Sequence, residues 1–366
     1  MRKWLGIFVR YDWTLMFAVM ALTAIGLLAI YGINISRGGD FFQFKKQMLA
    51  VLIGLALTYA LSYFDYRQLR GLAIPIYLAG LTILLVALVL GKSAHGGGKW
   101  FVLGTLSFQP VELAKVMLAV SLAGYLSKQV RKRLNWIAFA GSFIALLGYV
   151  IPVLLQPDFG SAVVLIAIWG AAVFICGPPR HAWWLMALGL VGVSMLLWNF
   201  GLKPYQRDRI SSFFNPRLDP YGASYNVAQA RIAVGSGGML GKGIGEGSQA
   251  RLRFLPESST DFIFAVIGEE LGFVGLFVLL GLFGVALYCL LRLGMASEDP
   301  FAGIVLTAFA AIIGFHLTVN AGMNLGLTPV TGIPLPFVSA AASSVLTMFI
   351  MIGIAESVAV YGRKGF

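Results

Sequence analysis

Charged side chains are scarce in this chain of 366 residues: Asp, Glu, Lys and Arg make up 11% of it, whereas 59% is hydrophobic. A soluble domain of this length cannot keep so much apolar surface away from water, so the composition excludes one. Cysteine is scarce too, with only Cys176 and Cys289, both at or in the ends of expected helices. These two residues suggest neither a disulfide framework nor a set of metal ligands.

Long apolar runs make up most of what is present. A helix needs roughly 20 apolar residues to cross a bilayer, and about ten runs approach that length. They are too long and continuous for barrel strands, and only helices and barrels satisfy their backbone hydrogen bonds within lipid. The sequence predicts an all-α polytopic membrane protein, a single transmembrane domain over residues 1–366. The expected spans are about 13–33, 47–64, 72–90, 109–127, 136–155, 159–176, 183–200, 262–292, 301–325 and 337–360.

The positions of Lys and Arg predict the orientation. The first run lacks a cleavage site, so we expect it to be retained as a span. The short loops on the side of the amino terminus carry more Lys and Arg than those opposite, which indicates that this side is cytoplasmic. With about ten spans both termini are cytoplasmic, and the long polar segment 201–260, between helices 7 and 8, is extracytoplasmic. One span more or fewer would move this segment to the other side.

The net charge of +12 is explained first by the attraction of cytoplasmic loops to anionic lipid headgroups. That explanation does not cover segment 201–260, where basic residues outnumber acidic ones. A basic surface there suits an anionic ligand at the outer membrane face.

Several ionisable residues fall inside or beside the expected spans. Glu112 and Lys115 are three residues apart and share one helix face. Charges inside a membrane are expensive unless paired, so they indicate either a functional cavity or an ion pair that joins helices. Asp158, in the turn 156–160, either caps the following helix or faces the same cavity as Glu112. His316 alone is typical of an interhelical hydrogen bond.

The glycine-dense segment 235–247 contains Lys242. It matches neither the dinucleotide-binding pattern nor the P-loop, and no expected strand precedes it. Its backbone N–H groups and its lysine suit a diphosphate, while a flexible surface loop is the alternative interpretation. Asp261 lies where the polar segment meets the next apolar run. The residues 259–261 form a helix N-cap signature, but a partly desolvated carboxylate can instead act as a general base.

Taken together, several motifs resemble the SEDS family (shape, elongation, division and sporulation), and the resemblance covers nearly the whole chain. The motifs are Gln109-Pro110-x-Glu112-x-x-Lys115, Gln156-Pro157-Asp158-x-Gly160, Tyr205-Gln206-Arg207-x-Arg209-Ile210, Asp219-Pro220-x-Gly222, Phe254-Leu255-Pro256-Glu257-x-x-Thr260-Asp261-Phe262 and Pro334-Leu335-Pro336-Phe337-Val338-Ser339. Residues 232–243 are closer to the elongation branch, RodA, whereas residues 215–222 also resemble the division branch, FtsW. The family usually has Tyr-Gly-Gly where this chain has Ala340-Ala341-Ala342, which removes a hydroxyl and a close backbone approach.

The resemblance implies a peptidoglycan glycosyltransferase that polymerises lipid II at the outer face of the bacterial cytoplasmic membrane during cell elongation. It also implies a class B penicillin-binding protein (a transpeptidase) and other elongation-complex proteins as partners, with no nucleic acid and no organic cofactor. Carried over by position, Asp261 is the catalytic aspartate. The residues matching charged cavity positions or loop arginines are Glu112, Lys115, Asp158, Arg207 and Arg209.

In the implied reaction, the GlcNAc 4-hydroxyl attacks the lipid-linked MurNAc C1 with inversion. Asp261 is the expected base, and Arg207, Arg209 and Lys242 are expected to stabilise the leaving diphosphate. Mg²⁺ or Mn²⁺ suits such carboxylates and phosphates. A lipid II flippase is the alternative, since transporters also place ionisable groups near the midplane. A scaffold that only recruits partners would tolerate substitution of Asp261.

Overall fold

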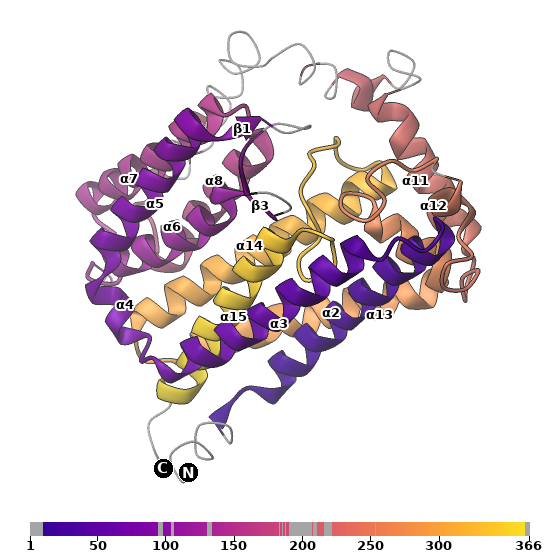
Figure 1. Ribbon diagram of the computed structural model, residues 1–366. Coiled ribbons are helices and arrows are strands. Elements are labelled where there is room, and N and C mark those ends of the chain that lie inside the picture. The colour runs from indigo at the N-terminus through magenta and orange to yellow at the C-terminus, as the bar shows by residue number, and fades with distance from the viewer. Residues whose placement is uncertain are drawn as a thin grey trace.

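The structure, a computed structural model, describes residues 10–93, 98–103, 106–129, 134–182, 211–215, 222–252 and 254–362, together with residues 184, 186, 188, 189 and 207. Within these residues helices dominate (Figure 1). They are α2 (Trp13–Ser36), α3 (Phe42–Tyr63), α4 (Arg67–Gly71), α5 (Ala73–Leu90), α6 (Pro110–Leu126), α7 (Trp136–Leu155), α8 (Phe159–Cys176), α11 (Ala223–Ser236), α12 (Ser248–Arg251), α13 (Ile263–Ala296), α14 (Pro300–Leu325) and α15 (Ala342–Tyr361). The short strands β1 (Lys92–Ser93), β2 (Lys99–Leu103) and β3 (Leu106–Phe108) form an antiparallel sheet in the order β1-β2-β3.

Among the described residues, eight helices are long and apolar enough to cross a membrane: α2, α3, α5, α7, α8, α13, α14 and α15. The prediction of a helical, multi-pass membrane protein is therefore confirmed. Helix α6 occupies the expected span 109–127 but has only 17 residues, shorter than these eight. The expected span 183–200 lies almost entirely outside the described residues.

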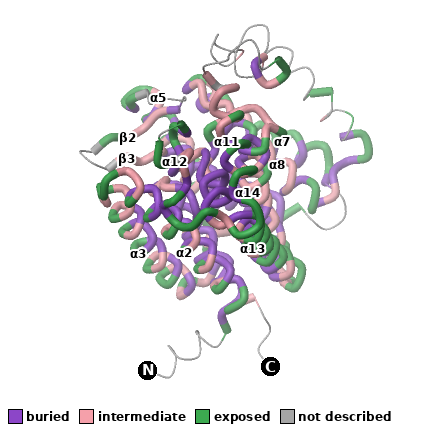
Figure 2. Tube along the Cα trace, turned by 90° about the vertical axis from the view of Figure 1, so that its right-hand side faces the viewer, coloured by how far each residue is buried: buried purple, intermediate pink, exposed green. Residues whose placement is uncertain are grey.

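The helices differ in how much of their surface other helices cover. In α15, 89% of the most apolar stretch is buried, against 22% in α5. Helix α15 therefore lies inside the bundle, whereas α5 turns most of its apolar side chains outward, as a helix facing lipid should. Figure 2 shows the buried residues gathered along the middle of the bundle and exposed residues along the outer sides of α3 and α13.

Helices α3 and α15 are separated in sequence but cross closely because small residues lie between them. A Cβ atom added at Gly54 would collide with the Phe349 ring, and one added at Gly353 would lie 3.0 Å from the Thr58 Cα. At this crossing the Thr58 hydroxyl donates a hydrogen bond of 2.8 Å to the Phe349 carbonyl. Within a membrane the hydrophobic effect does not drive helices together, because lipid tails are as apolar as the side chains. Close packing at small residues and interhelical hydrogen bonds of this kind stabilise the contact instead.

Helix α13 is interrupted at Gly272, whose φ of 66° and ψ of −164° are not helical. The interruption leaves backbone groups of α13 without helical partners, and the glycine-rich segment supplies them. The Lys242 and Gly243 N–H groups donate to the Glu269 and Glu270 carbonyls, both at 3.0 Å. The Phe273 N–H donates to the Gly238 carbonyl at 2.9 Å. Irregular backbone at membrane depth is tolerated only where such partners exist.

This packing decides between two interpretations of the glycine-dense segment. Residues 238–243 are bonded to α13, so they are not a loose surface loop. The polar segment 201–260, predicted as a long loop between two spans, contains the short helices α11 and α12. Helix α11 has only 14 residues, too few for a span, and polar side chains are spread along it. Long apolar runs were the signal used to find helices, so this one was missed.

The two ends of the bundle can be distinguished by contacts between distant parts of the chain. The Asp12 N–H at the start of α2 donates to Glu356 near the end of α15, and Arg67 donates to the Tyr361 carbonyl. Arg292, near the end of α13, pairs with Asp12 at the same end. Because α13 runs away from residue 263 toward this end, Asp261 lies at the opposite end of the bundle (Figure 1).

Candidate active site

A cavity of about 430 Å³ opens at the end of the bundle that holds Asp261. Its wall comes from the first turns of α6 and α8, the turn before α13, and the segment 331–344 that leads into α15. Strands β2 and β3 and the start of α3 complete it. Four residues proposed from the sequence line this one cavity: Glu112, Lys115, Asp158 and Asp261. The structure therefore brings together residues that lie far apart in the sequence.

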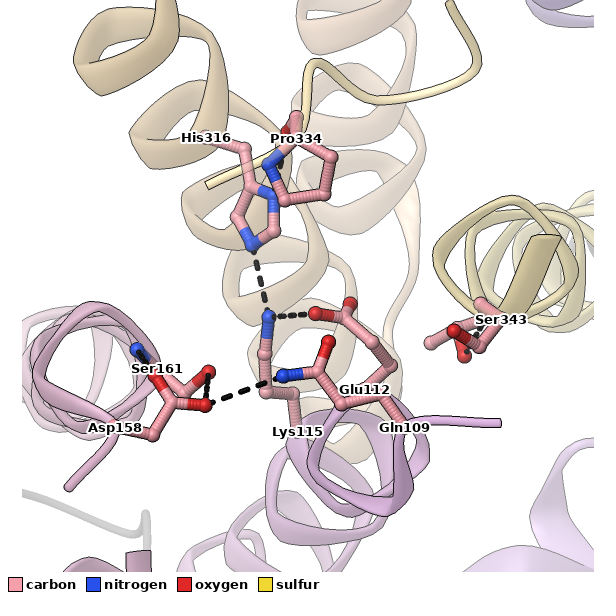
Figure 3. A network of polar contacts seen from close by, with 9 residues as sticks. Gln109, Glu112, Lys115, Asp158, Ser161, His316, Pro334 and Ser343 are labelled. Atoms are coloured by element: carbon pink, nitrogen blue, oxygen red, sulfur yellow. Dashed lines mark hydrogen bonds and ion pairs between the residues drawn. The ribbon is translucent and has the colours of Figure 1, made fainter. Parts of the chain in front are cut away.

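Lys115 is the centre of a buried polar cluster (Figure 3). Its Nζ donates to Glu112 Oε1 at 2.8 Å and lies 3.1 Å from His316 Nε2. His316 Nδ1 lies 3.1 Å from the Pro334 carbonyl oxygen, which can only accept a hydrogen bond. The ring must therefore carry its proton on Nδ1 and accept from Lys115 at Nε2, which makes it a neutral histidine beside an ammonium group.

The position of this cluster explains why a charged lysine is tolerated there. Glu112 and Lys115 are both 2% exposed, and at that depth each charge needs a partner. Pro110 begins α6 without needing an N–H donor, which places Glu112 in the first turn of the helix. A carboxylate is favourable there because the helix dipole is positive at that end. The expected interhelical hydrogen bond of His316 is confirmed.

Asp158 fills both of the roles that the sequence left open. Its Oδ1 accepts from the Ser161 N–H at 3.0 Å, which caps α8. Its Oδ2 accepts from the Ser161 hydroxyl at 2.8 Å and from Gln109 Nε2 at 3.3 Å, on the cavity side (Figure 3). Burial raises the pKa of this carboxyl above its ordinary value, while the bonds from Ser161 oppose that rise.

Three side-chain oxygens of cavity-lining residues are buried and have no hydrogen-bond partner within the described part of the chain: Glu112 Oε2, Thr331 Oγ1 and Ser344 Oγ. Buried polar atoms are nearly always bonded to protein or water, so unbonded ones need an explanation. All three belong to side chains that line the same cavity, although the oxygen atoms themselves are covered by protein. The sequence analysis singled out Glu112 but neither Thr331 nor Ser344.

Asp261 lies in the turn immediately before α13 and is partly buried. Helix α13 begins at Ile263, with Phe262 at its N-cap position and no side-chain cap hydrogen bond. Asp261 therefore lies one position before the N-cap residue of this helix. A Cβ atom added at Gly332, which has a φ of +74°, would lie 3.5 Å from Asp261 Oδ2. The segment 331–334 thus passes directly beside the carboxylate.

The residues preceding Asp261 are held by polar side chains from α3 and the end of α2. Arg37 donates to the Ser258 hydroxyl at 2.7 Å, and Gln43 donates to the Ser259 hydroxyl at 2.9 Å.

The next turn of α3 carries Lys46, which lines the cavity and donates to Ser107 at 3.3 Å. Lys46 was not among the site residues predicted from the sequence. Its polar neighbours on the same helix, Gln43 and Gln47, were the available signal for a polar helix face.

The three cations expected to hold a diphosphate are placed differently. Lys242 Nζ donates to Glu269 Oε1 at 2.7 Å and to the hydroxyls of Ser236 and Ser248. Neither Lys242 nor Arg207 is among the described residues that line the cavity. Arg209 lies outside the described residues. Diphosphate binding by these three residues remains a prediction, while Lys46 and Lys115 are cations that the structure places in the cavity wall.

Comparisons with known proteins agree with this arrangement. The family model described as cell cycle protein, FtsW/RodA/SpoVE, matches residues 12–364. The probable peptidoglycan glycosyltransferase FtsW of Geobacter sp. (strain M18) is 32% identical over 94% of this chain and 95% of its own. The peptidoglycan glycosyltransferase MrdB of Escherichia coli (strain K12) is 32% identical over 96% and 94%.

Two solved structures have the same fold. A chain from a peptidoglycan synthase complex, described as coordinating polymerization and crosslinking, superposes with a TM-score of 0.81 and 36% identity. That match covers 96% of this chain and 99% of the other. The rod shape determining protein RodA of Thermus thermophilus superposes with a TM-score of 0.73 and 32% identity, covering 97% and 98%.

Proposed function

Since the chain belongs to the FtsW/RodA/SpoVE family of cell cycle proteins, we propose that it is a peptidoglycan glycosyltransferase that polymerises lipid II. The observation that carries this proposal is the cavity that joins the Asp261 carboxylate to the ammonium groups of Lys46 and Lys115. A glycosyl transfer from a lipid diphosphate needs a base at one end of the reacting bond and positive charge at the other. This cavity contains both.

In the proposed reaction, the 4-hydroxyl of a GlcNAc attacks C1 of the lipid-linked MurNAc. The Asp261 carboxylate accepts the hydroxyl proton as the new C–O bond forms. The bond between C1 and the diphosphate oxygen breaks, and the diphosphate leaves with the electron pair. Attack from the face opposite the leaving group inverts C1. A base and a leaving-group site on different walls of one cavity suit such an in-line displacement.

The positive side of the cavity supports departure of the diphosphate. Lys115 is held by Glu112 and His316, so its ammonium group is oriented before any ligand binds. Lys46 approaches from α3 and donates a long hydrogen bond of 3.3 Å to Ser107. Fixed donors aimed at developing charge lower a barrier without the cost of reorganisation. Thr331 and Ser344 also line the cavity beside these lysines.

A divalent cation, Mg²⁺ or Mn²⁺, is part of the proposal. The described residues contain no cluster of three or more His, Cys, Asp or Glu able to hold a metal ion. Mg²⁺, however, is commonly bound by one or two carboxylates together with substrate phosphates. Glu257 and Asp261, one turn apart in the cavity wall, are the carboxylates that fit this pattern. Such a cation would neutralise charge on the diphosphate.

We further propose that the chain lies in the bacterial cytoplasmic membrane with both termini cytoplasmic, which makes the cavity extracytoplasmic. A class B penicillin-binding protein that crosslinks the glycan is the proposed partner, supported by the similarity to a chain of a peptidoglycan synthase complex. Elongation is the proposed process, supported by the motif at residues 232–243. The FtsW and MrdB relatives named above match this chain at the same identity of 32%, so overall identity favours neither branch.

Purified protein in detergent tests this proposal. With lipid II, a divalent cation and the partner protein, the wild type should form glycan chains, and Asp261→Asn should form none while keeping the same melting temperature. Glu246→Gln is the matched control, because Glu246 is exposed, pairs only distantly with Arg251, and lies outside the cavity wall. Undiminished product from Asp261→Asn would refute the assigned role. A flippase would form no glycan with the wild type or with either variant. Moving a lipid between leaflets needs a membrane with two sides, and detergent provides none.

A further inference from the structure

The start of α13 departs from ordinary helix geometry at one bond. In a regular helix the Ala265 N–H would donate to the Asp261 carbonyl four residues earlier. Here the side-chain amide of Asn324 lies between these two groups. Its Nδ2 donates to the Asp261 carbonyl at 3.0 Å, and its Oδ1 accepts from the Ala265 N–H at 3.1 Å. The inserted amide keeps Asp261 outside the helix, which begins at Ile263.

A second asparagine, one turn earlier on α14, holds the same carbonyl. Asn320 Nδ2 donates to the Asp261 carbonyl at 3.0 Å and to the Ile333 carbonyl at 2.8 Å. It therefore joins the turn before α13 to the segment 331–334, the part of the cavity wall that passes beside the Asp261 carboxylate. The two asparagines are also bonded to each other, since Asn324 Nδ2 donates to the Asn320 carbonyl at 2.8 Å.

Both asparagines are completely buried. Burying an amide destabilises a protein unless its hydrogen bonds are made. Here both amides bond the Asp261 carbonyl, and their remaining bonds go to Ala265, Ile333 and each other. The other side of this turn is also fixed: Ser339 Oγ donates to the Thr260 carbonyl at 2.6 Å, and the Ala340 N–H donates to the Ser259 carbonyl at 2.8 Å. The backbone around Asp261 is thus held from two directions.

We propose that Asn320 and Asn324 are positioning residues that set the direction of the Asp261 carboxylate. The inference rests on the proposed role of Asp261 as general base. Without the inserted amide, the Ala265 N–H and the Asp261 carbonyl can bond each other directly. The Ala265 N–H, which now also donates to the Phe262 carbonyl at 3.1 Å, then makes an ordinary helical bond, and Asp261 replaces Phe262 as the N-cap residue. An N-cap carboxylate turns toward the N–H groups of the first turn and away from the cavity. A general base must lie within hydrogen-bond distance of its proton, so this rotation removes the base without removing the residue.

Asn324→Leu and Asn320→Leu test the inference, because leucine has a similar size and leaves no polar group unbonded on its own side chain. In the lipid II assay with the partner protein, each should lower kcat about 100-fold, the usual effect of misplacing a reacting group by about 1 Å. KM should stay within about twofold, because a lost transition-state contact lowers kcat while substrate binding is retained. The hydrogen-exchange rate of the Ala265 amide should change in Asn324→Leu, because this amide no longer donates to Asn324 Oδ1.

Asn34→Leu is the matched control, since Asn34 is a buried asparagine on α2 whose amide nitrogen has no hydrogen-bond partner among the described residues. It should keep the wild-type kcat. If Asn324→Leu does not fold, Asn324→Ser, whose hydroxyl cannot span the distance between Asp261 and Ala265, should show the same loss. Wild-type kcat in the folded Asn320 and Asn324 variants, while Asp261→Asn is inactive, would overturn the positioning role alone. Activity of Asp261→Asn would overturn the proposed function instead.

Discussion

Two lysine–glutamate pairs at the cavity end of this bundle have almost the same length and different surroundings. Lys115 and Glu112 are 2.8 Å apart, and Lys242 and Glu269 are 2.7 Å apart. Both glutamates are buried, whereas the lysines differ: the Lys115 side chain is 2% exposed and that of Lys242 is 32% exposed. The useful comparison is therefore between the groups that surround the two carboxylates.

The Glu269 carboxylate is fully bonded. Besides Lys242, it accepts from the Ser248 hydroxyl at 2.9 Å and from the Gln249 N–H at 3.2 Å. A Cβ atom added at Gly247 would lie 2.9 Å from Glu269 Oε2, so no ligand fits there. This pair fastens the segment 237–249 to the interrupted helix α13.

The Glu112 carboxylate is only half bonded. Oε1 accepts from Lys115, while Oε2 is buried without a partner among the described residues, in the wall of a 430 Å³ cavity. An unbonded buried oxygen destabilises the protein. The two pairs therefore differ in how completely the carboxylate is bonded: Glu269 is fully bonded to a neighbouring segment, whereas Glu112 belongs to a cavity-lining side chain with one oxygen unbonded among the described residues.

Lys115→Met should produce the largest effect. It leaves the Glu112 charge buried without its partner, and breaking a buried pair on one side costs about 3–5 kcal/mol. The melting temperature in detergent should fall and glycan synthesis should be lost. The double variant Lys115→Met with Glu112→Leu should recover most of the melting temperature, because no charge then remains buried, and should stay inactive. Recovery of glycan synthesis in the double variant would show that this pair only joins helices.

Lys242→Met should have a smaller effect, confined to stability. Glu269 would keep its bonds from Ser248 and Gln249. The bond from Lys242 to the Glu269 carboxylate is lost, which costs about 1.5–3 kcal/mol, and the bonds from Lys242 to the exposed side of the Ser236 and Ser248 hydroxyls are lost with it. The KM for lipid II should stay unchanged in the remaining folded protein. A tenfold rise in KM with an unchanged melting temperature would instead support the diphosphate role that the sequence predicted for Lys242.

The difference between these pairs shows what the sequence could predict. Apolar run lengths predicted the membrane helices, because the bilayer thickness imposes the same length on each span. Intramembrane charge then identified Glu112 and Lys115, since such charges are rare. The sequence left Asp158 and Asp261 as either helix caps or site residues, and the motifs of the SEDS family favoured the site. All four residues line the cavity.

The remaining site residues depend on geometry that a linear pattern does not contain. Lys46 resembles any lysine near the end of a span until the packing of α3 places it in the cavity wall. Asn320 and Asn324 act on Asp261 through backbone groups some 60 positions earlier in the chain. The partner of Lys242 is not evident in the sequence because Glu269 follows 27 residues later, on the interrupted helix α13.

Asp158→Asn should give the smallest effect and sharpen the comparison through pH. Burial raises the pKa of the Asp158 carboxyl in the folded protein above its value in the unfolded chain. Between these two pKa values the folded state holds more protons, so this residue makes stability fall as pH rises. The melting temperature of the wild type minus that of the variant should therefore decrease as the pH increases from about 4, the ordinary pKa of an Asp side chain. If the wild-type melting temperature minus that of the variant instead grows with pH, the folded protein stabilises the ionised form of Asp158. The Asp158 carboxylate would then be as well bonded as that of Glu269.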